Sequence, residues 1–381
     1  MSYLEKLLNG VEVEWKPLAH KEYGVAELSR GRVMSKEYLA DNAGEYPVYS
    51  SQTANNGEIG KIKTFDHDGE AVTWTTDGAN AGTVFHRTGK FSITNVCGLI
   101  KVKNIEELNY KFLFYWLSIE AKKHVYSGMG NPKLMSNQMA KIPIPIPPLS
   151  VQKEIVRILD SFTELTAELT AELTARQKQY EHYRDKLLNF SELNGFECKW
   201  QTIKEICYFM NGKGHEKSIV EHGKYIVVNS KFISTDGRVK KYSDKQISPI
   251  FKNNILMVMS DLPNGKALAK CYLVDENDKY TLNQRICALS IKNTNELDFK
   301  FLYYILNRNK QLLRYDNGAD QTNLRKDNIL EVKIPVPSLE EQARIVSILD
   351  KFDTLTTSIS EGLPKEIELR KKQYEYYRDM L

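Results

Sequence analysis

The sequence predicts an α+β protein in which two mixed α/β lobes are joined by two long helices that form an antiparallel coiled coil. The main observation is an internal repeat. Residues 176–188, RQKQYEHYRDKLL, return at 370–381 as RKKQYEYYRDML, with nine of twelve aligned positions identical. Residues 147–162 return at 337–352, at an offset of 190. The chain is therefore two copies of a unit of about 190 residues, which predicts a pseudo-twofold arrangement.

Each lobe is expected to combine short strands with an aromatic helix. Strand-like runs at 46–49, 71–74 and 255–259 are separated by Gly, Asn and Asp turns. Aromatic helices are expected near 108–126 and near 297–315, where the two copies again resemble each other. The repeat thus extends from the helical segments into the lobes.

A proline-rich string ends each lobe and a long helical pattern follows it. The strings are IPIPIPP at 142–148 and IPVP at 334–337, which impose an extended backbone because Pro and its preceding residue resist helix. A continuous helix over 150–189 would be about 60 Å long. In the second copy Gly362 and Pro364 should break the helix and restart it.

Apolar residues at helical spacing form a matched seam in each copy, which predicts the coiled coil, although either seam could instead pack on its own lobe. Seam positions are also the expected docking residues for a partner. They are Ile155, Phe162, Leu165, Leu169, Leu173, Tyr180 and Tyr183 in the first copy, and Ile345, Phe352, Leu355, Tyr374 and Tyr377 in the second.

The N-terminus predicts a circular arrangement. YLEKLLNG at 3–10 resembles YRDKLLNF at 183–190, and Trp15 parallels Trp200. The second copy stops at Leu381, so its missing end is expected at the start of the chain. The two termini should then lie close together.

A four-residue repeat, TAELTAEL at 166–173, lies in the first long helix. Each unit adds about one turn, near 6 Å, and would locally unwind a supercoil. The first copy is four residues shorter than the second between Phe and the R-x-K-Q-Y segment, which is one unit. The number of units could set the distance between the lobes, or the repeat could be low-complexity helical filler.

Composition predicts a soluble, cytoplasmic protein that does not enter a membrane. The chain has 381 residues, of which 41% are hydrophobic and 27% charged, and it has no apolar run of the roughly 20 residues that span a bilayer. Its five cysteines form no CxxC motif and no cluster with His, so neither disulfides nor a metal site are indicated. The net charge of +4 permits an anionic partner.

Catalytic signatures are missing from the sequence. It has no GxxxxGK[ST] phosphate loop, and its nearest approach to a methyltransferase tetrapeptide, Asn131-Pro132-Lys133, lacks a second Pro and an aromatic residue. The seven His are scattered. We therefore expect a non-catalytic chain with no catalytic residues, no metal and no cofactor of its own.

Polar loops suit nucleic-acid recognition, because Asn and Gln pair with adenine, Arg and Lys pair with guanine, and Ser, Thr and Lys also contact phosphates. Any single loop is more simply a solvated turn. Jointly, however, the helical parts repeat closely while the loops diverge, as expected for two lobes that read different half-sites. The candidates are Ser51, Gln52, Asn55, Asn56, Thr75, Thr76, Asn80, Asn131 and Lys133 in the first copy, and Asn229, Lys231, Arg238, Lys240, Lys266, Gln284, Arg285, Gln321, Asn323, Arg325 and Lys326 in the second.

Over its whole length the sequence resembles the specificity subunits of type I restriction-modification systems. The resemblance rests on IPIPIPPLSVQKEIVRIL and IPVPSLEEQARIVSIL, on QYEHYRDKLL and QYEYYRDML, and on the TAEL units. It implies a target-recognition domain at 1–145, a helical spacer with the TAEL units at 146–192, a second target-recognition domain at 193–336 and a second helical region at 337–381.

The resemblance also implies partners. Each recognition domain would read one part of a split, asymmetric site in double-stranded DNA. The family's helices hold two methyltransferase subunits, and two restriction and translocation subunits join for cleavage. S-adenosylmethionine, ATP and Mg²⁺ would then belong to those partners. A stand-alone pseudo-dimeric DNA-binding protein and a coiled-coil adaptor without a DNA role remain the alternatives.

Overall fold

The computed structural model describes residues 10–126, 130–190, 198–263, 265–357 and 361–380. Contacts divide the chain into two compact units. Unit 1 comprises residues 1–171 and 365–381, and unit 2 comprises residues 172–364. The long first helix contributes to both units, and most of the last helix belongs to unit 1, so neither unit is one continuous copy of the repeat.

The lobe of unit 1 is built on two small sheets. The first is antiparallel, with the order β2(Ala26–Arg30)-β8(Cys97–Val102)-β5(Ala71–Thr75)-β6(Val84–Arg87). The second has the order β4(Glu58–Ile62)-β3(Ala43–Tyr49)-β7(Ser92–Ile93), and a separate ladder joins β1(Glu14–Pro17) to β9(Pro143–Ile146). The helices are α2(Lys36–Asp41), η1(Ala54–Gly57), α3(Tyr110–Glu120), η2(Ala121–His124) and α4(Ser136–Met139).

The lobe of unit 2 repeats this plan. Its first sheet has the order β11(Cys207–Asn211)-β19(Ile286–Ile291)-β15(Ile255–Val258)-β17(Cys271–Leu273), and its second has the order β12(Ile219–Val220)-β14(Tyr242–Ser243)-β13(Tyr225–Val228)-β18(Tyr280–Leu282). Two ladders join β10(Lys199–Thr202) to β21(Lys333–Val336) and β16(Ser260–Asp261) to β20(Thr322–Asn323). The helices are α6(Ile203–Ile206), η3(Glu216–Ser218), α7(Ser230–Ser234), α8(Phe299–Leu306), α9(Lys310–Leu313) and α10(Lys326–Leu330).

Three longer helices complete the chain: α5(Leu149–Leu187), α11(Leu339–Thr357) and α12(Gly362–Asp379). The long helix expected after the first proline-rich string is confirmed, and it is continuous over 39 residues. The predicted break in the second copy is also confirmed. Gly362 has a φ of +73°, a left-handed conformation that Gly adopts without strain, and a new helix starts there.

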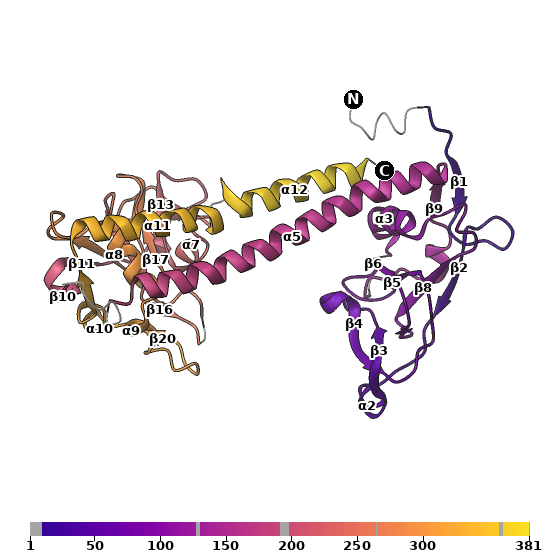
Figure 1. Ribbon diagram of the computed structural model, residues 1–381, viewed down its shortest axis with the longest axis horizontal. Helices are drawn as coiled ribbons and strands as arrows, with labels where there is room; N and C mark the ends of the chain where they lie inside the picture. The colour runs from indigo at the N-terminus through magenta and orange to yellow at the C-terminus, as the bar shows by residue number, and fades with distance from the viewer. Residues whose placement is uncertain (1–9, 127–129, 191–197, 264, 358–360, 381) are drawn as a thin grey trace. The chain divides into compact units, whose positions relative to one another are not determined.

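The long helices pair within each unit, as the coiled-coil prediction requires. In unit 1, α12 runs antiparallel to the first part of α5 (Figure 1), and Tyr377 stacks on Phe162 with ring centroids 5.3 Å apart. In unit 2, α11 runs antiparallel to the last part of α5 (Figure 1), and Phe352 stacks on Tyr183 at 5.8 Å. The N-terminal echo at 3–10 and the expected proximity of the termini fall largely on residues 1–9 and 381, which lie outside the described residues.

Near their starts α5 and α11 pack on their own lobes, which corrects part of the predicted docking set. Ile155 is 1% exposed and lies in the core of unit 1, together with Leu159. Ile345 is fully buried in the core of unit 2 with Leu349. These seam positions cannot contact a partner, because their apolar side chains are used to fix each helix to its lobe.

A buried glutamine anchors each of these helices through the same three hydrogen bonds. The Gln152 side chain donates to the carbonyls of Glu107 and Pro147 at 2.8 and 2.9 Å and accepts from the amide of Asn109 at 2.9 Å. The Gln342 side chain does the same with Glu296, Pro337 and Asp298, at 2.8 Å in each case. The repeat is therefore preserved in buried polar contacts as well as in sequence.

Candidate nucleic-acid interface

Three polar loops of unit 1 are joined into one surface. The strand β5 leads into Thr76 and Asp77, and this segment pairs with the loop that precedes α4: the Leu134 amide donates to the Thr76 carbonyl at 2.9 Å, and Asp77 lies opposite Lys133 in a β-bridge. The loop at 50–57 is attached at the other side, because the Asn80 amide side chain donates to the Thr53 hydroxyl at 3.1 Å. The candidates in these loops therefore share one face of the lobe.

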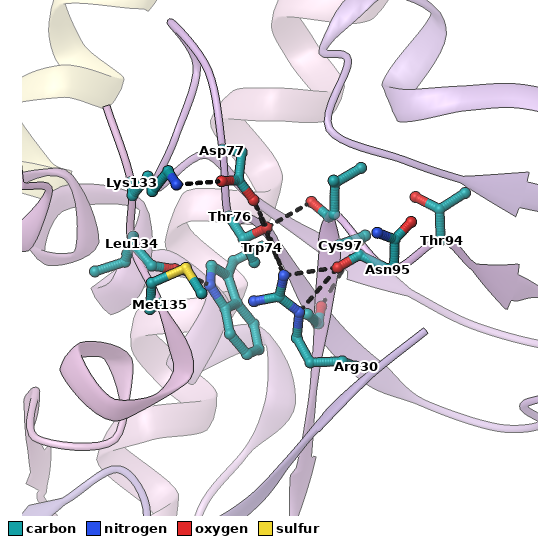
Figure 2. A network of polar contacts seen from close by, with 12 residues as sticks. Arg30, Trp74, Thr76, Asp77, Thr94, Asn95, Cys97, Lys133, Leu134 and Met135 are labelled. Carbon is teal, nitrogen blue, oxygen red and sulfur yellow. Dashed lines mark hydrogen bonds and ion pairs between the residues drawn. The ribbon is translucent and has the colours of Figure 1, made fainter. Parts of the chain in front are cut away.

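A charged network joins residues of this surface. Figure 2 shows the Asp77 carboxylate between the Lys133 ammonium and the Arg30 guanidinium, each 3.9 Å away. Arg30 also donates to the Asn95 carbonyl at 2.6 Å and to the Thr76 hydroxyl at 3.1 Å, while the Thr76 hydroxyl lies 2.6 Å from Asp77. Lys133 keeps 52% of its side chain exposed. The network thus holds a cation at the surface in a defined position.

Two candidates of unit 1 are excluded as direct contacts. Thr75 and Thr76 are fully buried, and their hydroxyls bind the backbone of the protein: Thr75 bonds to the Asn80 carbonyl, and Thr76 donates to the Val96 carbonyl at 2.9 Å. These hydroxyls stabilise the loop by hydrogen bonds within the protein, since a buried hydroxyl needs an internal partner. The neighbouring Asn55 and Asn56 are exposed and have left-handed φ angles of 49° and 54°, which Asn tolerates better than most residues.

The remaining candidates of unit 1 are accessible to different degrees. Asn80 and Asn131 are exposed, while Ser51 is half-buried. Gln52 is exposed, and its side-chain amide donates to the Glu58 carbonyl. Beneath the loop, Arg87 is 3% exposed, donates to the Asn56 carbonyl at 2.8 Å and stacks on the Tyr49 ring, so it supports the loop from inside.

Unit 2 builds the equivalent ladder from different side chains. The Leu324 amide donates to the Met259 carbonyl at 2.7 Å, as Leu134 does to Thr76, and Ser260 then lies opposite Asn323. The Gln321 side-chain amide donates to the Ser260 hydroxyl at 2.7 Å. A polar hollow of about 380 Å³ is found here, lined by Tyr315, Asn317, Asp320, Gln321, Thr322, Asn323, Arg325 and Asn328. The structure therefore brings together three candidates, namely Gln321, Asn323 and Arg325.

The other candidates of unit 2 are placed as follows. Asn229 caps α7 through its side-chain oxygen, which accepts from the Phe232 amide at 2.9 Å, so this oxygen has a structural role. Gln284 donates to Glu216 at 2.6 Å and precedes Arg285, whose carbonyl accepts from the Met259 amide beside the ladder. Those with exposed side chains are Lys231, Arg238, Lys240, Lys266, Gln284, Arg285 and Lys326.

Sequence reasoning missed a matched basic segment in each lobe, Arg30-Gly31-Arg32 and Asn211-Gly212-Lys213. Arg32 bridges to Thr94, and Lys213 bridges to Asn283. A Cβ on Gly31 would lie 2.0 Å from the Ile93 carbonyl oxygen, and one on Gly212 would lie 1.9 Å from that of Asn283, so only Gly allows this approach. The sequence signal is x-Gly-basic at the end of the second strand of each lobe, β2 and β11, but the residues around it differ between the two copies.

The predicted docking residues that are not buried lie along the paired helices. Phe162, Leu165, Leu169, Leu173, Tyr180, Phe352, Leu355, Tyr374 and Tyr377 are half-buried, and Tyr183 is 41% exposed. The described residues contain no group of three or more His, Cys, Asp or Glu side chains that could hold a metal ion. Among the described helices, none is long and apolar enough to cross a bilayer.

A known protein family matches both copies of the repeat. The family model for the type I restriction modification DNA specificity domain matches residues 12–176 and again residues 197–369. The chain belongs to this family of type I specificity subunits. The sequence repeat and the two lobes thus correspond to two copies of one family domain.

Two relatives match this chain over nearly its full length. The specificity subunit of the type I restriction enzyme EcoR124I/EcoR124II of Escherichia coli is 35% identical over 100% of this chain and 96% of its own. A type I specificity subunit of Mycoplasma pneumoniae is 34% identical over 95% and 96%.

Solved structures share the fold. The S subunit of a type I restriction-modification system from M. genitalium superposes with a TM-score of 0.59 at 18% identity, covering 100% of this chain and 97% of that one. A chain from a study of complex assembly and conformational transition of a type I system gives 0.60 at 16% identity, covering 96% of each chain. At these identities the likeness concerns the fold.

Proposed function

We propose that the chain reads a bipartite, asymmetric site in double-stranded DNA, one part with each lobe, and holds two copies of a methyltransferase subunit. One observation carries this proposal: the two lobes share scaffold contacts but differ at the surface. Gln152 and Gln342 make the same three buried bonds, whereas the ladder position occupied by Asp77 and Lys133 in one lobe is occupied by Ser260 and Asn323 in the other. A repeated scaffold with different exposed polar groups suits two different half-sites.

The repeated helices support the second part of the proposal. Equivalent aromatic pairs, Phe162 with Tyr377 and Phe352 with Tyr183, give the chain two similar helical surfaces. Two similar surfaces suit two copies of one partner. In this proposal the chain is non-catalytic, S-adenosylmethionine and ATP with Mg²⁺ bind to the partners, and two restriction and translocation subunits join the complex for cleavage.

The test is a base-modification map of DNA from a methylation-free host that expresses this chain with the methyltransferase encoded beside it. The expected result is one bipartite motif with a fixed spacer and N6-methyladenine in both parts, lost when this chain is omitted. Methylation that does not depend on the chain would contradict the proposal. Tight sequence-specific binding by the chain alone, without methylation, would favour a stand-alone DNA-binding protein, and no DNA binding at all would favour a coiled-coil adaptor.

A further inference from the structure

A short backbone ladder joins the segment that follows β5 or β15 to the loop before α4 or α10. It places a different pair of side chains in each lobe. In unit 1 the pair is Asp77 and Lys133, and in unit 2 it is Ser260 and Asn323. Both pairs are fixed by the same backbone bond, from Leu134 to Thr76 at 2.9 Å and from Leu324 to Met259 at 2.7 Å. We propose that Lys133 and Asn323 are equivalent base-reading residues, with Lys133 selecting guanine in one half-site and Asn323 selecting adenine in the other. This inference rests on the proposed DNA-reading function.

The electrostatics of the ladder favours a neutral base edge over a phosphate. Asp77 lies 3.9 Å from the Lys133 ammonium, and Asp320 lines the hollow that contains Asn323. A carboxylate beside the contact residue repels a phosphate, whereas it leaves a neutral base edge free to bind. Asp77 partly offsets the charges of Lys133 and Arg30, and Asp320 lines the same hollow as Arg325, so the attraction for a phosphate is reduced at both positions.

The chemistry of each side chain selects the base. A Lys ammonium only donates hydrogen bonds, and guanine presents two acceptors, O6 and N7, in the major groove. Asp77 acts as a positioning residue, because it lies between Lys133 and Arg30 and accepts from the Thr76 hydroxyl (Figure 2).

In unit 2 the amide of Asn323 both donates and accepts, which matches N6 and N7 of adenine. Asn323 is exposed, and its side chain makes no hydrogen bond to the described part of the chain. Gln321 lies beside it, with its amide group oriented by the bond to the Ser260 hydroxyl. The hollow offers space for a base edge next to both amides.

The experiment compares base-modification maps for the wild-type chain and for exchange variants, each expressed with the neighbouring methyltransferase in a methylation-free host. Lys133→Asn should change the base required at one position of one half-site from guanine to adenine. Asn323→Lys should make the opposite change in the other half-site. Each change should alter the base preference at that position by roughly 10- to 100-fold and leave the other half-site unchanged.

Conservative variants and matched controls separate base reading from folding. Lys133→Arg and Asn323→Gln should keep the wild-type motif, because Arg also pairs with guanine and Gln with adenine. Lys21 and Asn295 are exposed. Lys21 precedes β2 and Asn295 follows β19, at the ends of these sheets opposite to the ladders, so Lys21→Asn and Asn295→Lys should keep the motif as well.

Three outcomes would overturn the inference while leaving the proposed function intact. The first is an unchanged motif in both exchange variants, and the second is a change in the half-site opposite to the one expected. The third is equal loss of methylation in the exchange and conservative variants of one residue, which would assign that residue to folding. Failure of the proposed function is distinct, since the wild-type chain itself would then give no motif.

Discussion

Phe162 of the first copy stacks on Tyr377 of the second, with ring centroids 5.3 Å apart and planes 18° from parallel. The equivalent residues make the reciprocal pair: Phe352 of the second copy stacks on Tyr183 of the first, at 5.8 Å and 27°. Each aromatic pair therefore joins the two copies of the repeat. Both units contain helices from both copies, so the copies are not folded one after the other as separate domains.

The reciprocal pairing predicts that each phenylalanine stabilises the C-terminal helical part of the other copy. Phe162→Ala should reduce the free energy of unfolding of unit 1 by about 2 kcal/mol, since the half-buried ring loses both apolar contact and aromatic packing. Native-state hydrogen exchange should show faster exchange in α12. Phe352→Ala should instead affect the last part of α5, and a change spread evenly over both units would contradict the reciprocal pairing.

The buried side chains of Gln152 and Gln342 should each contribute strongly to the stability of the fold. Gln152→Leu leaves two carbonyls and one amide without their partner and should cost about 2–4 kcal/mol of stability, measured by urea unfolding. Gln342→Leu should cost a similar amount. The control is Gln177→Leu, on the exposed surface of α5, which should change stability by less than about 0.5 kcal/mol.

An aspartate clamps each aromatic helix to the long helix that follows it. Asp160 lies 2.6 Å from the Lys111 ammonium and 2.7 Å from the Tyr115 hydroxyl, and Asp350 makes the same contacts with Lys300 and Tyr304. Asp160→Asn should cost about 1–3 kcal/mol, because it removes the charge from two hydrogen bonds at a half-buried site.

An exposed ion pair provides the comparison for this aspartate. Asp185 and Lys310 keep 53% and 82% of their side chains exposed. Asp185→Asn should therefore cost at most about 1 kcal/mol. Equal losses for Asp160→Asn and Asp185→Asn in thermal unfolding would show that the clamp adds nothing to an ordinary surface pair.

Alkaline pH should weaken unit 2 through Tyr180. Burial beside α11 raises the pKa of Tyr180 from 10.0 to about 12. The folded state therefore keeps its proton where the unfolded state loses it, so this stability is complete below pH 10 and is lost as pH rises from about 10 to 12. Tyr180→Phe should make the decline in unfolding free energy over this range shallower. If the unfolding free energy of Tyr180→Phe differs from that of the wild-type chain by the same amount at pH 8 and at pH 12, the assignment is contradicted.

The TAEL units predict a change in the spacer of the DNA site. One more Thr-Ala-Glu-Leu unit after Leu173 would lengthen α5 by about one turn, near 6 Å, which corresponds to one or two base pairs. A methylation map of the insertion variant should show this longer spacer. Replacing one unit by Ser-Ala-Gln-Leu, without a change in length, should leave the spacer as it is, and unchanged spacing in the insertion variant would reject the idea.

Repetition and local chemistry along the chain were enough to predict part of the fold. Two similar segments 190 residues apart predicted two similar lobes, apolar periodicity predicted the 39-residue helix α5, and Gly362 with Pro364 predicted the break before α12. Helical periodicity and backbone restrictions depend on neighbouring residues, so they can be read along the chain.

Which polar side chains are accessible to a ligand depends on packing between distant segments, and the sequence did not predict it. Thr75 and Thr76 resemble their exposed neighbours in sequence, yet the sheet buries them, while Asn323 remains in an open hollow. Tertiary packing also revealed that Asp77 joins Lys133 to Arg30, three residues from separate parts of the chain. The burial of a side chain and its ion pairs depend on contacts between segments far apart in sequence, and local sequence patterns do not predict those contacts.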